Sequence, residues 1–418
     1  MSATTRVLTG LASGAVIGLS LAAWHPTAAL DVANVAQPIG KLWLNALQMT
    51  VVPLVLALVV VGVNTASDAA ASGRIARRAI VVFIVLLTVG ALFTALAAPF
   101  AFTLFPHNPT LAAALDHAAV LPAAQGAPVG WIDALVAIVP SNAIAAAAQS
   151  AMLPLVVFAL FLGFAMTRLQ AAQRTMLVGF FQAIADAMIV IVRWVLWAAP
   201  LGVFALVLAV TARAGLSMIS ALGFYISLEI GLYIVVGALM LPVAVFWGGE
   251  RLRHFASAIA PAQVVAASTQ SSLATLPAML ESARDRLGWS QQVSSLTLPM
   301  AVTLFRITSP IQYVASASFI AWVFGIHVGV AQLLAGATLA VVISLGSVGL
   351  PGQVSFLATN LPVAQAMGLP VAPLGIMLAV DTLPDVFATA GNVTADLAAT
   401  SVVERQTRAD ANPTSAPS

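Results

Sequence analysis

Cysteine is absent from this chain, and charged residues are scarce, at 7% of its 418 residues. Without cysteine there can be no disulfide framework, no cysteine-based metal site and no thiol nucleophile. Soluble globular proteins carry roughly 25% charged residues, so a soluble fold of this size could not cover its surface with so few. The formal net charge is +2 with no long basic block, which argues against a nucleic-acid partner. These shortages leave lipid as the solvent for much of the surface.

Hydrophobic residues make up 61% of the chain and occur in long runs. A helix needs about 20 apolar residues to cross the hydrocarbon core of a bilayer. Residues 7–24 could also mimic a secretory signal, but we favour a first membrane helix because the rest of the chain is equally apolar. The stretches that predict membrane helices are 7–24, 41–65, 79–104, 131–167, 176–212, 220–248, 293–325 and 373–403.

Two further apolar stretches, 255–280 and 330–366, are interrupted in the middle by hydroxyl-bearing residues and glycine. Backbone that leaves the helix at membrane depth is tolerated only against protein or a water-lined cavity. Interrupted helices in corresponding positions of two halves indicate the binding site of a transporter. Surface loops between short helices are the alternative, and the apolar flanks fit it poorly. We therefore expect an all-α integral membrane protein with eight transmembrane helices, two re-entrant helical hairpins and a disordered polar tail at 405–418.

The basic residues predict the orientation of the chain in the membrane. We place the N-terminus in the cytoplasm and let each interrupted stretch return to its own side. Only Lys41 and Arg213 then fall outside, and Arg193 and Arg306 lie deep in spans. The remaining arginines fall on the cytoplasmic side, as the positive-inside rule requires. We expect a multi-pass protein of the plasma membrane, which in bacteria is the inner membrane, with both termini inside.

The last apolar stretch carries four polar residues, Asp381, Asp385, Asn392 and Asp396, at spacings that place them on one helix face. A charge at the middle of the bilayer costs ~2.5–3.5 kcal/mol even on the more lenient insertion scale. Three carboxylates on one stripe therefore need a polar cavity, a cation, a basic partner or a cationic substrate group. The alternative is that they only pair with neighbouring helices.

Other polar positions carry weaker signals. Glu229 is expected to be a packed or pore-facing residue. The five histidines show no metal-ligand spacing, and the glycine-rich run 344–349 lacks the Gly-Lys-Ser/Thr ending of a nucleotide-binding loop. No histidine lies near the serines of the interrupted stretches in sequence, which argues against a serine hydrolase. We expect a transporter rather than an enzyme, and a channel or non-transporting receptor is the alternative from another class.

Several motifs resemble the dicarboxylate/amino acid:cation symporter family, which includes the glutamate transporters. Residues 48–55 resemble its second span, 138–142 and 153–154 its fourth, and 199–206 its fifth. The runs 271–277 and 347–352 are similar to the tips of its two hairpins, and the last-span stripe is similar to the family's site. The resemblance covers nearly the whole chain.

The resemblance implies roles for individual residues. Asp385 would hold a substrate ammonium group with help from Thr389, and Ser272 would meet the substrate carboxylate. Asn392 would bind that carboxylate or help a cation, and Asp396 would be a cation ligand. The substrate-binding positions implied are Ser271, Ser272, Ser347, Gly349, Pro351, Asp385, Ala388, Thr389 and Asn392. The cation-coupling positions implied are Arg306, Thr308, Ser309, Asn392 and Asp396, with Asp396 and Asn392 as the candidate sodium ligands.

Two departures from the family pattern bear on this reading. The family has Asn-Met-Asp-Gly-Thr in its seventh span, where this chain has Phe305-Arg306-Ile307-Thr308-Ser309. Two oxygen ligands for sodium are thereby lost, and we expect Arg306 to act as a built-in cation for Asp396, or to pair with another acid such as Asp385. Members with acidic substrates carry an arginine where this chain has Ala388.

The resemblance also implies an architecture and a function. We expect a homotrimer in which 1–70 and 128–215 form a fixed scaffold, while 74–104 and 220–404 form a mobile transport part that moves as an elevator. The chain would take up a small neutral amino acid, or a carboxylate, together with a proton or sodium and without a cofactor. A C4-dicarboxylate symporter in which Arg306 binds the anion is the alternative within the class.

Overall fold

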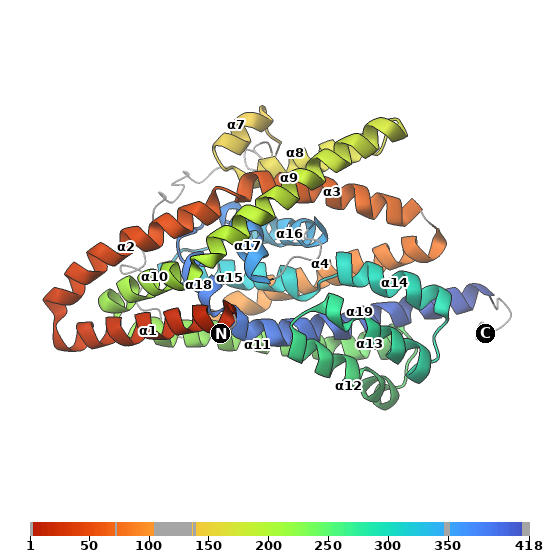
Figure 1. The fold of residues 1–418 in the computed structure, drawn as a ribbon. Helices are drawn as coiled ribbons and strands as arrows, with labels where there is room; N and C mark the ends of the chain where they lie inside the picture. Colours follow the sequence, from red (N-terminus) through yellow and green to blue (C-terminus); the bar gives the residue numbers. More distant parts are fainter. Residues whose placement is uncertain (1–2, 72, 104–135, 137–138, 347–351, 412–418) are drawn as a thin grey trace.

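The computed structural model describes residues 3–71, 73–103, 136, 139–346 and 352–411, and this part of the chain is almost entirely helical, without a β-strand (Figure 1). Within these residues, six helical stretches are long and apolar enough to cross a membrane. The helices of the first half are α1 (Ala3–Trp24), α2 (Pro26–Gln48), α3 (Val51–Ala71), α4 (Arg74–Thr103), α7 (Ala143–Ala148), α8 (Met152–Met166), α9 (Ala171–Trp197), α10 (Ala199–Ala214) and α11 (Leu216–Pro242). Those of the second half are α12 (Leu252–Thr269), α13 (Ser272–Glu281), α14 (Gln291–Leu304), α15 (Thr308–Phe324), α16 (Val330–Gly346), α17 (Gly352–Ala366), α18 (Leu374–Val380) and α19 (Thr382–Ala411).

At one end of the molecule, α1 and α2 pack together against α10 (Figure 1). Gly10, Gly14 and Gly18 lie four residues apart on one face of α1, where that helix crosses α10. A Cβ atom added to Gly10 would lie 2.4 Å from the carbonyl oxygen of Pro200, so only glycine permits this approach. Membrane helices associate through small residues in this way because lipid removes the hydrophobic drive between them.

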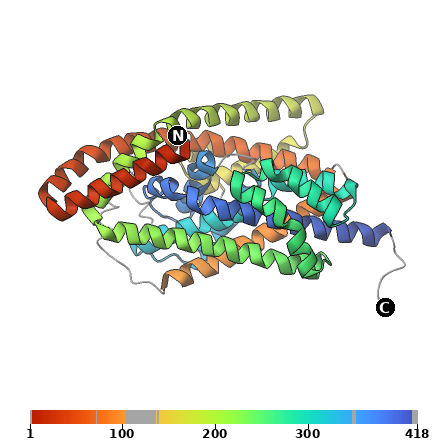
Figure 2. The same ribbon diagram turned by 60° about the horizontal axis from the view of Figure 1, so that its bottom comes forward.

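The predicted stretch 176–212 is two helices, α9 and α10, which meet at Ala198. Pro200 lies in the first turn of α10, where a missing backbone N–H costs no helical hydrogen bond. Figure 2 shows α9 along an outer edge of the molecule, and several of its large apolar side chains are exposed, with Trp197 82% accessible. An apolar surface of this kind suits contact with lipid rather than water.

The first interrupted stretch contains α12 and α13, which lie against each other. The turn between them falls at Gln270, which has a left-handed backbone with φ of 51°. Ser271 caps α13 by accepting a hydrogen bond from the backbone N–H of Ala274. The second interrupted stretch contains α16 and α17, but its predicted break at 347–351 lies outside the described residues.

The helix α19 runs far beyond the predicted span, to Ala411, so the expectation of disorder from residue 405 was wrong for 405–411. Tertiary contacts explain the difference. The Arg405 guanidinium donates to the backbone carbonyls of Phe246 and Trp247, and Asp410 forms ion pairs with Arg74 and Arg78 of α4.

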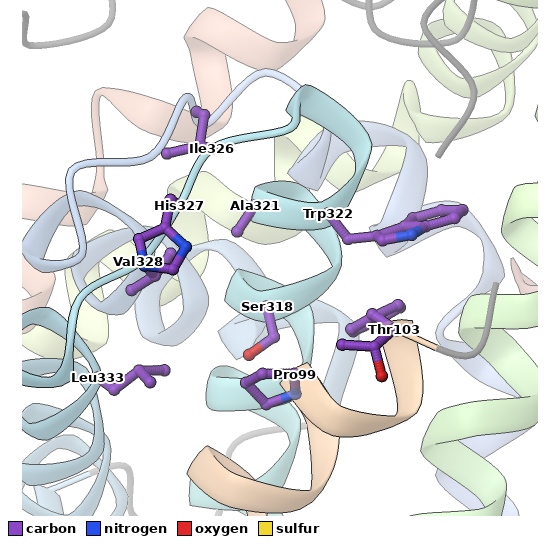
Figure 3. Close-up of a pocket in the computed structure, with 10 residues that line it drawn as sticks. Pro99, Thr103, Ser318, Ala321, Trp322, Ile326, His327, Val328 and Leu333 are labelled. Atoms are coloured by element: carbon purple, nitrogen blue, oxygen red, sulfur yellow. The ribbon is translucent and has the colours of Figure 1, made fainter. Parts of the chain in front are cut away.

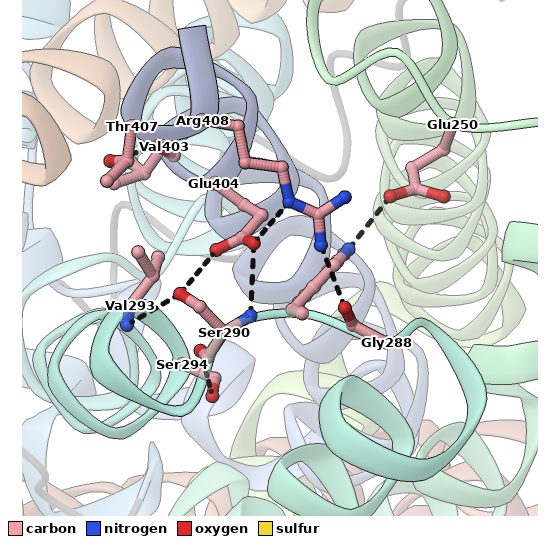
Figure 4. A network of polar contacts seen from close by, with 10 residues as sticks. Glu250, Gly288, Ser290, Val293, Ser294, Val403, Glu404, Thr407 and Arg408 are labelled. Carbon is pink, nitrogen blue, oxygen red and sulfur yellow. Dashed lines mark hydrogen bonds and ion pairs between the residues drawn. The ribbon is translucent and has the colours of Figure 1, made fainter. Parts of the chain in front are cut away.

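A polar network joins the loop before α14 to the same part of α19 (Figure 4). The buried Glu404 carboxylate accepts hydrogen bonds from the backbone N–H and the hydroxyl of Ser290, both at 3.0 Å, and from Arg408 at 2.7 Å. Arg408 also donates to the carbonyl oxygen of Gly288 at 2.8 Å. The indole N–H of Trp289 donates to Glu250 at 2.8 Å. These bonds fix the base of the first hairpin against α19.

Replacing Glu404 with glutamine is expected to destabilise the protein by about 1–3 kcal/mol, because an amide group would face donors that now bind a carboxylate. The thermal unfolding midpoint of purified protein in detergent measures this. Asp285→Asn is the control: Asp285 is exposed and pairs only with its neighbour Arg284, so no measurable change is expected. An unchanged midpoint for Glu404→Gln would show that the network contributes nothing to stability.

Candidate functional site

The site begins at a break in the membrane stretch 291–324, where α14 ends at Leu304 and α15 begins at Thr308. Asn392 of α19 stabilises the start of α15: its side-chain oxygen accepts from both the backbone N–H and the hydroxyl of Thr308, each at 3.0 Å. The Ser344 hydroxyl, near the end of α16, donates to the carbonyl oxygen of Arg306 at 3.4 Å. Residues far apart in sequence therefore satisfy the backbone groups that the break exposes.

The break opens onto a small polar cavity formed by α11, α15 and the start of α19. Its volume is about 20 Å³, which is room for roughly one water molecule. A substrate therefore cannot enter without movement of the surrounding helices. The lining residues are Tyr233, Arg306, Thr308, Ser309, Gln312, Tyr313, Asp381, Asp385 and Ala388.

The charges of the cavity are unequal, with two carboxylates and one guanidinium. Asp381 is buried and accepts a hydrogen bond from the side-chain amide of Gln312, while Asp385 is half-buried. Arg306 interacts electrostatically with both carboxylates. The surplus of negative charge leaves the cavity suited to a cationic group.

The positions at which the family has asparagine and aspartate are used here for packing. The Phe305 ring stacks on Phe83 of α4, with centroids 4.8 Å apart and an interplanar angle of 7°. Ile307 is fully buried, and its Cδ1 atom would lie 3.2 Å from a Cβ atom added to Gly90 of α4. The break is thus anchored to α4 by apolar contacts, and neither side chain offers an oxygen to a cation.

Asp396 lies deeper in α19 and does not line the cavity. It is fully buried, and neither of its carboxylate oxygens accepts a hydrogen bond from any described residue. Arg306, which the sequence offers as a built-in cation for Asp396, therefore donates no hydrogen bond to it in this arrangement, although the two charges interact electrostatically. Among the described residues, no group of three or more His, Asp or Glu side chains could hold a metal ion.

The structure brings together part of the predicted site. Thr308, Ser309, Arg306, Asp385 and Ala388 meet in the cavity, whereas the hairpin serines Ser271 and Ser272 do not line it. The Thr389 hydroxyl donates to the carbonyl oxygen of Asp385, within α19. Ser347, Gly349 and Pro351 lie outside the described residues.

Sequence reasoning missed three side chains of the cavity: Tyr233, Gln312 and Tyr313. Gln312 could have been predicted from the sequence, because its amide lies within an apolar run, where a polar group needs a hydrogen-bond partner. The two tyrosines could not, because a tyrosine in an apolar helix suits a core position equally well.

A larger cavity, of about 300 Å³, lies between α4, α15 and the start of α16 (Figure 3). Its lining is mostly apolar, including Phe102 and Trp322, with Thr103, Ser318 and His327 as polar exceptions. It holds no pair of opposite charges among the described residues that line it, so its chemistry does not suit a zwitterionic ligand.

Comparison with known proteins shows similarity to membrane symporters. The model of the sodium:dicarboxylate symporter family matches residues 3–406. The proton/glutamate-aspartate symporter of Escherichia coli (strain K12) is 27% identical over 377 residues, which cover 90% of this chain and 86% of that protein. The neutral amino acid transporter A of Homo sapiens is 29% identical, with coverage of 93% and 78%. The C4-dicarboxylate transport protein of Bacillus subtilis (strain 168) is 25% identical, with coverage of 90% and 87%.

These similarities confirm the resemblance drawn from the sequence motifs and the expectation of a transporter rather than an enzyme. The apolar helices and the polar cavity between them fit a protein that carries polar solutes through a bilayer. The chain belongs to the sodium:dicarboxylate symporter family and is a cation-coupled membrane symporter of amino acids or dicarboxylates.

Proposed function

We propose that this symporter takes up a small neutral amino acid together with a proton or sodium. The observation that carries the proposal is the composition of the cavity, where Asp385 and Asp381 outnumber Arg306 and Ala388 adds neither charge nor hydrogen bond. An amino acid brings one ammonium and one carboxylate group. In the proposed complex the ammonium group binds Asp385, and the carboxylate binds Arg306, the Thr308 and Ser309 hydroxyls, or the serines of the hairpin tips.

The coupling cation is proposed to bind at Asp396, with Asn392 beside it on the same face of α19. A fully buried carboxylate whose oxygens have no hydrogen-bond partner among the described residues is costly, and a bound cation or proton offsets that cost. Because Phe305 and Ile307 supply no oxygens, the chain has fewer sodium ligands here than the family motif provides.

Transport is proposed to follow an elevator mechanism within a homotrimer. The close association of α1 and α2 with α10 fits a fixed scaffold at 1–70 and 128–215. The packing of α11, α12, α14 and α15 on α19 fits a second unit that carries the cavity, within 74–104 and 220–404. The small volume of the cavity favours such a unit, because substrate entry requires a moving part.

Competition for uptake tests the substrate class. Purified protein in proteoliposomes is given labelled L-serine with excess L-alanine, L-glutamine, L-aspartate or succinate. We expect the half-inhibitory concentration of L-alanine to be at least about tenfold lower than that of L-aspartate, since an unpaired side-chain carboxylate loses about 1.4 kcal/mol or more. Tight L-aspartate binding would overturn the proposal and identify Arg306 as its partner.

A C4-dicarboxylate is the second candidate substrate, favoured by the presence of Arg306 in the cavity. The two carboxylates beside it argue against a dianion, because like charges repel. Succinate in the same competition series distinguishes the two: strong inhibition by succinate with none by L-alanine would establish the dicarboxylate.

A further inference from the structure

The helix α11 carries a polar stripe on an otherwise apolar span. Tyr225, Glu229 and Tyr233 lie four residues apart, so their side chains share one helix face. Tyr225 and Glu229 are 0% exposed and Tyr233 is 1% exposed. An ionisable residue at such a position is expensive, and in transporters such residues mark ion and proton pathways. Glu229 therefore needs an explanation beyond packing.

The hydrogen bonds of Glu229 are confined to one carboxylate oxygen. The Tyr225 hydroxyl donates to Oε1 at 2.7 Å, and the Ser316 hydroxyl of α15 donates to the same atom at 3.4 Å. Ser316 also lies 2.9 Å from the Tyr225 hydroxyl. The second oxygen, Oε2, has no hydrogen-bond partner among the described residues. Within this part of the chain no lysine or arginine forms an ion pair with Glu229.

We propose that Glu229 is a proton-binding site and that this symporter carries its coupling proton there. A proton from the water on one side adds to Oε2, forms an O–H bond and removes the buried charge. It leaves to water on the other side, and no other bond changes. Oε1 keeps its two donors throughout, so the network holds the side chain in place in both states. The proposal rests on the proposed function as a cation-coupled carrier and adds a proton site at Glu229, separate from the cation site proposed at Asp396.

Glu229 is placed to sense the state of the substrate cavity. Tyr233, one helical turn further along α11, lines that cavity together with Asp381 and Asp385. Glu229 repels both of these carboxylates, while Arg306 attracts them. Any change of charge in the cavity is therefore felt at Glu229, and the effect is reciprocal by linkage.

The remaining titratable groups described near α11 form no ion pair that would offset the buried charge of Glu229. Tyr313 of α15 interacts with Tyr233 across the cavity. The helix α19 also packs on α11 and carries Asp396 near its middle, with Glu404, Arg405, Arg408 and Asp410 toward its end. The charged residues of α4, α10 and α12 lie toward the ends of those helices: Arg74, Arg77 and Arg78 of α4, Arg213 of α10, and Arg253 and His254 of α12. Proton exchange with water requires opening of the adjacent cavity, which ties protonation to the transport cycle.

Infrared difference spectroscopy tests the site without any substrate. Purified protein in lipid nanodiscs is taken through a pH change, and the carbonyl stretch of a buried carboxylic acid is followed. Asp381 and Asp396 are buried as well, so the Glu229 signal is the part of the wild-type band that disappears in Glu229→Gln. We expect that part to be kept in Glu281→Gln, which alters an exposed glutamate outside the network. A band that is unchanged in Glu229→Gln, or no band in the wild type, would overturn the proposal.

Transport in proteoliposomes tests the coupling, with labelled L-alanine, L-serine and L-aspartate as probes and the membrane potential held at zero. One coupled proton supports about tenfold accumulation for each pH unit of gradient. We expect Glu229→Gln to exchange substrate between equal-pH compartments but to show no accumulation, and Glu229→Asp to restore part of it. Accumulation by Glu229→Gln equal to the wild type, or a wild type that ignores the pH gradient, would overturn the role in coupling.

A folded Glu229→Gln variant that loses exchange as well, with no rescue by Glu229→Asp, would assign Glu229 a structural role and also overturn the proposal. The two proposals fail in different ways. Absence of uptake of every amino acid, with the infrared band intact, would contradict the proposed substrate class and leave the proton-binding site standing.

Discussion

Replacement of Asp385 by asparagine is expected to lower the apparent affinity for a neutral amino acid by about 100-fold or more. A substrate ammonium group in the cavity would lose its charged partner, and removing one member of a buried pair costs about 3–5 kcal/mol. Asparagine keeps the size of the side chain, and Asp385 makes no side-chain hydrogen bond on which α19 depends among the described contacts, so the fold is expected to persist. Uptake of labelled L-serine into proteoliposomes measures the loss.

Asp186→Asn provides a matched control for this change. Asp186 is also an acidic residue within an apolar helix, α9, but it is exposed and accepts its hydrogen bond from Gln182 at 3.0 Å. Uptake by Asp186→Asn should equal that of the wild type. Uptake by Asp385→Asn at the wild-type level would remove Asp385 from the substrate site and with it the main support for an amino acid as substrate.

Replacement of Arg306 by methionine is expected to have the second-largest effect. The wild type should continue uptake when sodium is replaced by choline and should respond to an imposed pH gradient. In Arg306→Met, uptake in choline should fall by about 100-fold, because Asp381, Asp385 and Asp396 lose the guanidinium that interacts with all three. Sodium should restore part of it by supplying the missing positive charge.

Arg193→Met is the control for Arg306→Met. Arg193 also lies within an apolar helix, but it is exposed on α9 and does not contribute to the cavity. Its replacement should leave the response to sodium unchanged. Steep sodium dependence in the wild type that Arg306→Met does not alter would rule out Arg306 as a built-in cation.

Arg306 shows how a sequence departure acquires meaning from the structure. From its position in the altered sodium motif we expected it to act as a built-in cation, with Asp396, or another acid such as Asp385, as its partner. In the structure Arg306 lines the cavity with Asp381 and Asp385, whereas Asp396 lies outside that lining. Which aspartate Arg306 meets depends on the direction of the Arg306 side chain at the helix break. The spacing of the three aspartates cannot predict that direction, because they share one helix face.

Glu229 shows the opposite case, in which the signal is present in the sequence but the hydrogen-bond partner is not. A glutamate in an apolar span is visible from composition alone, but its partner Ser316 lies 87 residues away on α15. Only the packing of α11 on α15 shows that one carboxylate oxygen is satisfied and the other is not.

The amino-acid sequence by itself determined that this chain spans a membrane, that its helices are interrupted near 270, and that an acidic stripe marks the last span. These features follow from local properties: apolar length, backbone breaks at hydroxyl-rich runs, and helical periodicity. The resemblance to the family could also be seen in the sequence, because it rests on short motifs of neighbouring residues.

Tertiary structure alone decided which polar residues meet. Asn392 accepts hydrogen bonds from the start of α15, and Phe305 and Ile307 pack on α4. Contacts with the π-helical turn Val243–Trp247 and with α4 keep α19 helical to Ala411. Each of these depends on partners tens to hundreds of residues away. The pattern along one helix gives the face on which a side chain lies, but the neighbour across that face is set by how the helices pack.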